Sequence, residues 1–384
     1  MAFTATEFGR KLVAIRTALG QDREALALNS GIEVDRLAVL EDGSAEPTGD
    51  EILILADRFK KDFRYFLSDD APDPDNGVRL LFRTNGADLP PADRVAISEF
   101  VYLCRCQHRL ERDLNRHASH PGFRFHPTGN FFKGQGQKCA AALRHHLGLE
   151  DNEVIRDVFE SMRSMGFKVF RRRLENSNIS GLFMRDPEAG PCVLVNLAEG
   201  MARQRFSAAH EWGHGLMDDL MDDKPIILST IGNWASNDLI ELRANTFASD
   251  FLMPPTILLS IGSQWNEPKV VSDWAERFRV SVPALLTALV AAEMITMEKR
   301  EELRSAPRPP EPPDPELEGV NSTQLSRRSV LLERGISVDY VNLCFEAFSQ
   351  DVISFGLLCE MLLSNAAEIH EIAQIFGRSI YRDD

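Results

Sequence analysis

Residues 206–217 read FSAAHEWGHGLM, in which His210, Glu211 and His214 form the pattern His-Glu-x-x-His. Two histidines four positions apart lie one turn apart on a helix, so both rings can reach one ion from the same face. The glutamate between them stays close enough to activate a water molecule beside that ion, which suits a general base. Apolar residues surround the pattern at helical spacing, which favours a buried helix over a pair of surface histidines. The stretch therefore predicts a metal centre carried by a helix.

A catalytic zinc ion usually takes three protein ligands, so a third ligand is expected elsewhere in the chain. The histidine that some metallopeptidases place six residues after the pattern is excluded, because that position holds Leu220 and Met217 replaces the glycine before it. A second predicted helix offers Glu241, with Asn245 one turn later and able to orient a ligand by a hydrogen bond. Asp250, more than two turns beyond Glu241, is the competing ligand. Zinc is the expected ion and manganese the alternative.

Two charged runs near these elements are interpreted as solvated surface. The acidic run after the first motif consists of Asp218, Asp219, Asp222 and Asp223, and solvated helix exits more often have this composition than metal sites do. The basic run at residues 171–173 follows a predicted strand. No aromatic residues interleave with it, so we interpret it as a solvated strand end rather than a nucleic-acid site.

The composition is that of a soluble globular protein. The chain has 384 residues, a formal net charge of −15 and six cysteines without a C-x-x-C pair. The negative charge argues against a surface that binds nucleic acid throughout, although it permits one basic face. The first residues lack the apolar stretch of a signal peptide, and no run is long enough to cross a bilayer. We therefore expect a cytoplasmic protein with reduced cysteines and no membrane association.

Two stretches interrupt the periodic pattern and mark segment boundaries. Residues 68–77 (SDDAPDPDNG) are rich in acids and turn formers, and residues 305–319 (SAPRPPEPPDPELEG) hold too much proline for helix or sheet. The expected segments are an N-terminal block at 1–68, a linker with connecting helices at 69–138, the metal-binding domain at 139–304, a stiff proline-rich linker at 305–319 and a helical C-terminal domain at 320–384.

The N-terminal block has the pattern of short helices joined by tight turns. Gly31 separates a helix predicted at 22–29 from one at 34–41, as a helix-turn-helix unit requires. This order and the closing stretch EDGSAEPTGDEILILADRF resemble the Xre-type helix-turn-helix family, which implies DNA binding. The second helix is acidic, however, so binding of another protein or formation of a homodimer is the alternative. The candidate DNA contacts are Arg10, Lys11, Arg16, Arg23 and Arg36.

The remaining blocks combine helices with a small sheet. Helices are predicted at 92–116 and 138–147, and short β-rich runs at 167–170 and 192–196. The last block carries an apolar stripe that includes Phe345 and Phe348, which we interpret as packing residues.

Five separated motifs in order, namely GFKVF, ISGLF, VLVN, RQRFSAAHEWGHGLMD and ELRANTFASDFLMP, look like the ImmA/IrrE family of metallopeptidases. The resemblance covers residues 139–297. It implies metal binding by His210, His214 and Glu241, with Glu211 as the catalytic base. The expected fold is α+β and predominantly helical: an N-terminal helix-turn-helix bundle, a gluzincin-like metallopeptidase domain with a small β-sheet, and a short C-terminal helical domain.

Members of this family commonly lie beside or within Xre-type regulators, and several are described as cleaving a transcriptional repressor. The resemblance thus implies a zinc metalloendopeptidase that acts on one protein partner, such as an Xre-type repressor or a neighbouring gene product, in a stress, prophage or defence response. The alternative is a DNA-binding regulator or toxin–antitoxin component whose metal domain senses a ligand or a partner without turnover.

Overall fold

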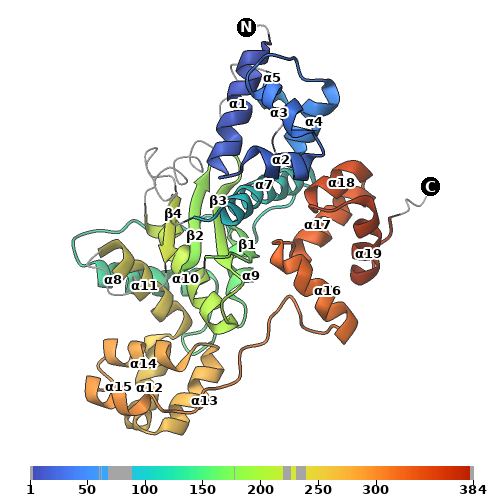
Figure 1. Ribbon diagram of the computed structural model, residues 1–384. Coiled ribbons are helices and arrows are strands. Elements are labelled where there is room, and N and C mark those ends of the chain that lie inside the picture. The colour runs from blue at the N-terminus through green and yellow to red at the C-terminus, as the bar shows by residue number, and fades with distance from the viewer. Residues whose placement is uncertain are drawn as a thin grey trace.

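The computed structural model describes residues 3–59, 61, 63–67, 89–176, 178–218, 226–230 and 239–380. Helices predominate and one small sheet lies at the centre, so the predicted α+β class is confirmed (Figure 1). Within these ranges no helix combines the length and apolarity that a membrane span needs. The predicted connection at 68–77 lies outside the described residues.

The central sheet has four strands in the order β1-β3-β2-β4. Strand β1 runs parallel to β3, whereas β2 is antiparallel to both β3 and β4. Both β-rich runs predicted from the sequence are present, in β1 and β3, while β2 and β4 were not predicted as strands. The strand bounds are Lys168–Arg172 for β1, Ile179–Asp186 for β2, Gly190–Asn196 for β3 and Ile226–Thr230 for β4.

Alternate side chains of the sheet enter two different apolar cores. On β3, Cys192 and Leu194 belong to one core, whereas Val193 and Val195 belong to the other. Successive side chains of a strand point to opposite faces, so β3 is covered on both sides and is apolar without alternation. One core contains α7 (Pro91–Asp113) and the C-terminal helices, and the other contains α10 (Met201–Met217) and α11 (Leu239–Leu252).

The second core holds the helices that surround the predicted metal centre. The predicted helix at 138–147 begins six residues earlier than expected, at Phe132. Helices α12 to α15 gather at the end of the molecule opposite the N-terminal bundle (Figure 1). The bounds are α8 Phe132–His146, α9 Val158–Ser164, α10 Met201–Met217, α11 Leu239–Leu252, α12 Pro255–Ile261, α13 Pro268–Phe278, α14 Val282–Ala291 and α15 Met297–Leu303.

The N-terminal bundle consists of short helices, several of which are capped at their starts by side chains. Thr4 and Asp22 each accept a backbone N–H, and Thr48 forms a reciprocal capping box with Glu51. Gly31, with φ 71°, provides the left-handed turn between α2 and α3. The helices are α1 Ala5–Ala18, α2 Arg23–Ser30, α3 Val34–Glu41, α4 Gly49–Arg58 and α5 Arg64–Leu67.

The C-terminal helices pack against the sheet rather than forming a separate core. The Phe170 ring on β1 lies 5.5 Å from that of Tyr340, centroid to centroid. Phe345 and Phe348 are buried, so their interpretation as packing residues is confirmed. The helices are α16 Ser322–Glu333, α17 Val338–Ser349, α18 Phe355–Met361 and α19 Ala366–Phe376.

The proline-rich stretch has no helix or strand at residues 307–314, as predicted, yet it is bound closely to the rest of the chain. Asp314 accepts two hydrogen bonds from Arg171, at 2.6 and 3.0 Å. Glu311 accepts the backbone N–H of Ala202 at 3.2 Å, in the first turn of α10. A carboxylate at a helix N-terminus is favourable, so this stretch supports the start of the helix that carries the histidines.

The prediction that residues 171–173 form a solvated strand end is wrong for the first two. Arg171 is 5% exposed and Arg172 is 9% exposed. Arg172 forms an ion pair with Glu99 of α7, in addition to the pair between Arg171 and Asp314. Distant carboxylates therefore neutralise the basic run, and sequence spacing along the strand could not reveal them.

Asp314→Ala is expected to destabilise the protein by about 3 kcal/mol, because it removes one partner of a largely buried ion pair. Thermal denaturation and limited proteolysis of the full chain measure the effect, with faster cutting expected in residues 305–319. Glu318→Gln, which changes an exposed carboxylate in the same stretch, is the matched control. Equal melting temperatures and cutting rates for Asp314→Ala and wild type would show that the stretch is not anchored.

Glu51→Gln is expected to lower the free energy of unfolding at neutral pH by an amount that shrinks in acid. Its hydrogen bond from Arg36 lowers the pKa of Glu51 from 4.5 to about 2. The ionised carboxylate thus stabilises the fold above the unfolded pKa of 4.5, and this contribution is lost as the pH falls toward about 2. Urea titrations from pH 7 to pH 3, with Glu33→Gln as control, measure it. A difference independent of pH would contradict the assignment.

Candidate metal centre

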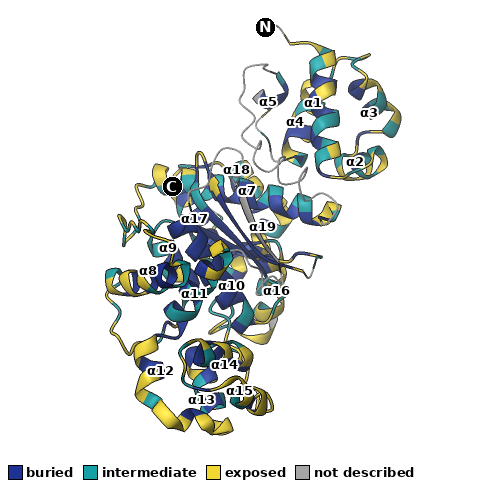
Figure 2. Ribbon diagram, turned by 90° about the vertical axis from the view of Figure 1, so that its left-hand side faces the viewer, coloured by how far each residue is buried: buried dark blue, intermediate teal, exposed yellow. Residues whose placement is uncertain are grey.

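Helix α10 carries the His-Glu-x-x-His pattern and lies buried between the sheet and α11 (Figure 2). Two glycines permit close contact on both sides of the helix. A Cβ atom at Gly213 would come within 3.0 Å of the Phe247 side chain on α11, and one at Gly215 within 2.6 Å of the Phe167 ring. Small residues beside the histidines therefore allow α10 to approach its neighbours closely enough to form a shared centre.

The three predicted ligands converge on one position. The Nε2 atoms of His210 and His214 lie 3.0 Å apart. The carboxylate of Glu241 on α11 places Oε2 3.2 Å from Nε2 of His210 and Oε1 3.4 Å from Nε2 of His214. Their ligand atoms lie within 4.8 Å of one another, whereas Asp250 does not belong to this group.

The spacing and chemistry of these atoms fit a zinc ion. Ligand atoms about 2.1 Å from a tetrahedral ion are separated by roughly 3.4 Å. The separations here run from 3.0 to 3.4 Å. Two imidazoles and one carboxylate are a common protein set for catalytic zinc, while manganese prefers more oxygen ligands. The residues present can hold the ion.

Each histidine is oriented by a hydrogen bond from its other ring nitrogen. Nδ1 of His210 lies 2.9 Å from Oδ1 of Asn245, and Nδ1 of His214 lies 2.5 Å from Oδ2 of Asp218. With the Nδ1 protons donated to these oxygens, both Nε2 lone pairs face the shared position. The prediction that Asp218 belongs to a solvated helix exit is wrong, because its side chain is 8% exposed and binds His214. The other acidic residues of that run lie outside the described residues.

The electrostatics of the centre favour a cation. Burial opposes protonation of His214, but the hydrogen bonds with Asp218 and Glu241 outweigh it and raise the pKa of the ring to about 10. Burial likewise raises the pKa of Glu241, yet the hydrogen bonds from the two histidines hold this pKa well below its ordinary value. The surrounding carboxylates therefore stabilise positive charge at this position.

Glu211 lies fully buried beside strand β2. A Cβ atom at Gly181 would stand 2.8 Å from Oε1 of Glu211 and 3.0 Å from its Cγ. The glycine in the motif ISGLF therefore leaves room for the glutamate. Sequence reasoning did not identify Gly181 or Asp218; the signal for Asp218 was its position one helical turn after His214.

The five cations predicted to contact DNA all bind groups within the N-terminal bundle. The contacts are Arg10 with Glu7, Lys11 with the carbonyl of Tyr65, Arg16 and Arg23 with Glu41, and Arg36 with Glu51. Lys11 is buried and Arg16 is largely so. These contacts weigh against phosphate binding by Lys11 and Arg16, and DNA binding stays a prediction.

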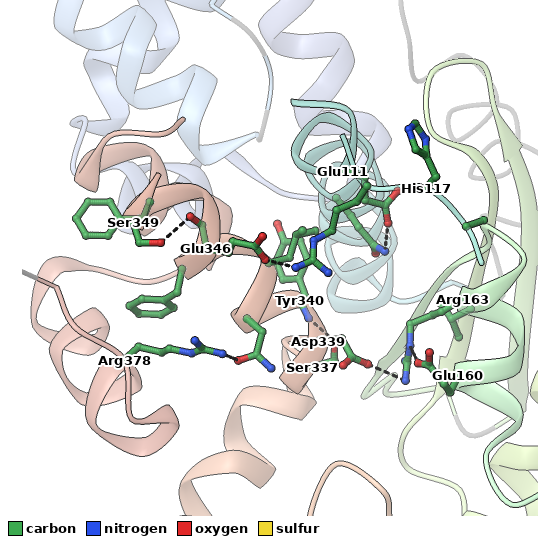
Figure 3. Close-up of a pocket in the computed structure, with 18 of the residues that line it drawn as sticks. Glu111, His117, Glu160, Arg163, Ser337, Asp339, Tyr340, Glu346, Ser349 and Arg378 are labelled. Atoms are coloured by element: carbon green, nitrogen blue, oxygen red, sulfur yellow. Dashed lines mark hydrogen bonds and ion pairs between the residues drawn. The ribbon is translucent and has the colours of Figure 1, made fainter. Parts of the chain in front are cut away.

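A cleft of about 890 Å³ opens away from the centre, between α7, α9 and α17 (Figure 3). Charged side chains line it in pairs, including Arg163 with Asp339 at 2.8 Å and Arg116 with Glu346. None of the three predicted ligands lines this cleft. It separates the C-terminal helices from the rest of the chain on one side.

Gly181→Ala is expected to retain metal binding and to displace the carboxylate of Glu211, because the new methyl group would stand 2.8 Å from its Oε1 atom. If Glu211 is the general base that the sequence resemblance implies, peptide hydrolysis should fall about 100-fold or more. Gly356→Ala is the control, since an added Cβ there meets no atom closer than 3.9 Å. Metal content and initial rates on one peptide substrate should be measured side by side. A Gly181→Ala protein with a normal rate would show that this contact does not constrain Glu211.

Comparison with known proteins shows a family similarity around the centre. Residues 162–289 match the model of the IrrE N-terminal-like domain. The chain is also 32% identical over 108 residues to the radiation response metalloprotease IrrE of Deinococcus radiodurans, a match that covers 27% of this chain and 32% of that protein. The chain thus spans about a third of the length of this curated relative. Through residues 162–289 it is similar to the ImmA/IrrE family of metallopeptidases.

Proposed function

We propose that this protein is a zinc-dependent endopeptidase that cleaves one specific protein partner. The observation that carries the proposal is the convergence of His210, His214 and Glu241 within 4.8 Å, with the buried carboxylate of Glu211 next to them on α10. The match to the IrrE N-terminal-like domain supports the same chemistry. In this assignment the centre is of the gluzincin type, with glutamate as the third ligand.

Each residue has a distinct part in the proposed hydrolysis. A bound zinc ion would polarise the scissile carbonyl and stabilise the negative charge that develops on its oxygen. Glu211 takes a proton from the attacking water molecule and delivers it to the leaving amine. Asn245 and Asp218 hold the histidine rings, and the packing of α10 against the sheet excludes bulk water from the base.

The partner is proposed to be a regulatory protein. The curated relative is named for a radiation response, and we extend this to a stress, prophage or defence response in which an Xre-type repressor or a neighbouring gene product is the substrate. The buried position of Glu211 supports selectivity, because a substrate must enter an enclosed centre. Incubation of the chain with the products of adjacent genes tests the identity of the substrate.

A DNA-binding regulator without turnover is the second candidate. The left-handed turn at Gly31 between α2 and α3 favours a helix-turn-helix unit. The pairing of Arg16 and Arg23 with Glu41 opposes it, because these cations already have carboxylate partners. Gel-shift titrations at moderate salt separate the candidates, since sequence-dependent binding is expected only of a DNA reader.

Glu211→Gln is expected to retain stoichiometric zinc and to lose at least about 100-fold in rate, because it removes the proton acceptor and no ligand. His210→Ala and Glu241→Ala are expected to lose the metal. Chelation should abolish wild-type hydrolysis and added zinc should restore it. Metal analysis paired with a cleavage assay is applied to the three variants and to the chelated wild-type protein. Cleavage at the wild-type rate by Glu211→Gln, or stoichiometric metal in both ligand variants, would refute the proposal.

A further inference from the structure

Behind His214 lies a hydrogen-bond network of buried polar side chains that extends away from the centre. Asp218 follows α10 and accepts a hydrogen bond from His214 at 2.5 Å through one oxygen. Its other oxygen accepts a hydrogen bond from Nη2 of Arg243 on α11. Nη1 of the same guanidinium donates to Oε1 of Gln135 on α8, at 3.0 Å. This network therefore links the ligand His214 of α10 to α11 and α8.

We propose that Asp218 and Arg243 are positioning residues for the metal ligand His214. The inference rests on the proposed function only in that a metal ion binds at the candidate centre. Asp218 fixes the proton of His214 on Nδ1 and thereby directs the Nε2 lone pair toward the ion. Arg243 holds Asp218 in place and acts on the ligand through it.

Burial makes this arrangement effective. The side chains of His214, Asp218 and Arg243 are 0%, 8% and 9% exposed, respectively. Hydrogen bonds between charged groups are strong where water is excluded, and a buried cation or anion requires a partner. Loss of either charged partner thus leaves the other uncompensated next to the ligand.

The end of the network that lies farthest from His214 is itself held in place. Nε2 of Gln135 donates to the carbonyl of Gly129 at 2.8 Å, and the guanidinium of Arg243 lies 5.4 Å from the centroid of the Phe132 ring. Gly136 brings α8 close to α11, because a Cβ atom there would stand 2.5 Å from the carbonyl oxygen of Arg243. Helix α8 contributes no predicted ligand, yet it constrains one.

One glutamate and one asparagine also contact the two histidines without replacing this function. Asn245 binds the other histidine, at 2.9 Å, and Glu241 contacts the Nε2 atoms of both rings. In the part of the chain that the structure describes, Asp218 is the carboxylate with a hydrogen bond to Nδ1 of His214. The two histidines are therefore oriented by different groups, an amide for one and an ion pair for the other.

The test is the affinity for zinc, measured by competition with a chromogenic chelator on the full chain. Asp218→Ala is expected to weaken zinc binding by about 10- to 100-fold, and Arg243→Ala by about tenfold or less. The double variant should bind zinc no more weakly than Asp218→Ala, because Arg243 acts through Asp218. Substituted cobalt provides a second readout, since a changed ring orientation should alter its visible absorption in Asp218→Ala.

The matched control is Asp186→Asn, which breaks another buried pair in which Arg105 donates to Asp186 at 2.7 Å. It should lower the melting temperature and leave the zinc affinity and cobalt spectrum unchanged. If Asp218→Ala does not fold, Asp218→Asn replaces it. This variant keeps one oxygen acceptor but presents no negative charge to Arg243. An intermediate loss of zinc affinity is therefore expected.

Three results would overturn the inference. These are an Asp218 variant that binds zinc within twofold of wild type, losses in the two single variants that multiply in the double variant, and an equal loss in Asp186→Asn. None of them depends on a cleavage assay. A wild-type chain that binds zinc but cleaves no partner would refute the proposed function alone, whereas one that binds no zinc would refute both.

Discussion

The candidate centre depends on the close packing of α10 against α11. The first helix supplies two imidazoles and the second supplies the carboxylate, so the donor atoms meet only if the helix backbones approach closely. Gly213 permits this approach, because a Cβ atom there would contact the Phe247 side chain at 3.0 Å and the Cα atom of Ala244 at 3.3 Å. Trp212 packs against α11 with its ring centroid 5.1 Å from that of Phe251. Aromatic packing and a missing side chain together set the distance between ligands.

The same packing places charged groups where water cannot screen them. Buried and partly buried carboxylates gather around the histidines, and a cation bound at the shared position would offset their mutual repulsion. A second set of buried charges lies at the other end of α10, where Arg171 binds Asp314 and Glu311 receives the N–H of Ala202. The proline-rich stretch is thus part of the support for the motif helix. This explains why a segment that cannot form a helix or a strand is nevertheless held in a defined path.

Local sequence patterns predicted the helices and strands whose apolar residues recur at regular spacing, and they predicted the ligands that share one helix. The i, i+4 spacing of His210 and His214 is a property of any helix, and the apolar faces of α7, α10 and α11 were visible in the sequence. The strand β2 was missed because its burial on both faces removes the alternation that marks a half-exposed strand. The start of α8 was missed because Gly134 and Gly136 lower helix propensity, although close contact with Phe131 and with α11 requires small residues at these positions.

Long-range pairs were beyond the reach of the sequence. Asp218 looked like one of several solvated acids, and only the fold brings Arg243 beside it. The basic run at the end of β1 likewise looked exposed until Glu99 and Asp314 were found opposite it. In both cases the sign of the charge was clear and the partner was not, because charge pairing between distant segments depends on tertiary structure.

The most direct test of the central claim is X-ray absorption at the zinc edge on the chain loaded with one equivalent of zinc. If His210, His214 and Glu241 bind the ion, the spectrum will show two imidazole nitrogens and at least one oxygen at about 2.0–2.2 Å. His214→Ala should then show one imidazole fewer or no bound zinc. A first shell containing sulfur, or one with no imidazole scattering in the wild-type protein, would contradict the account.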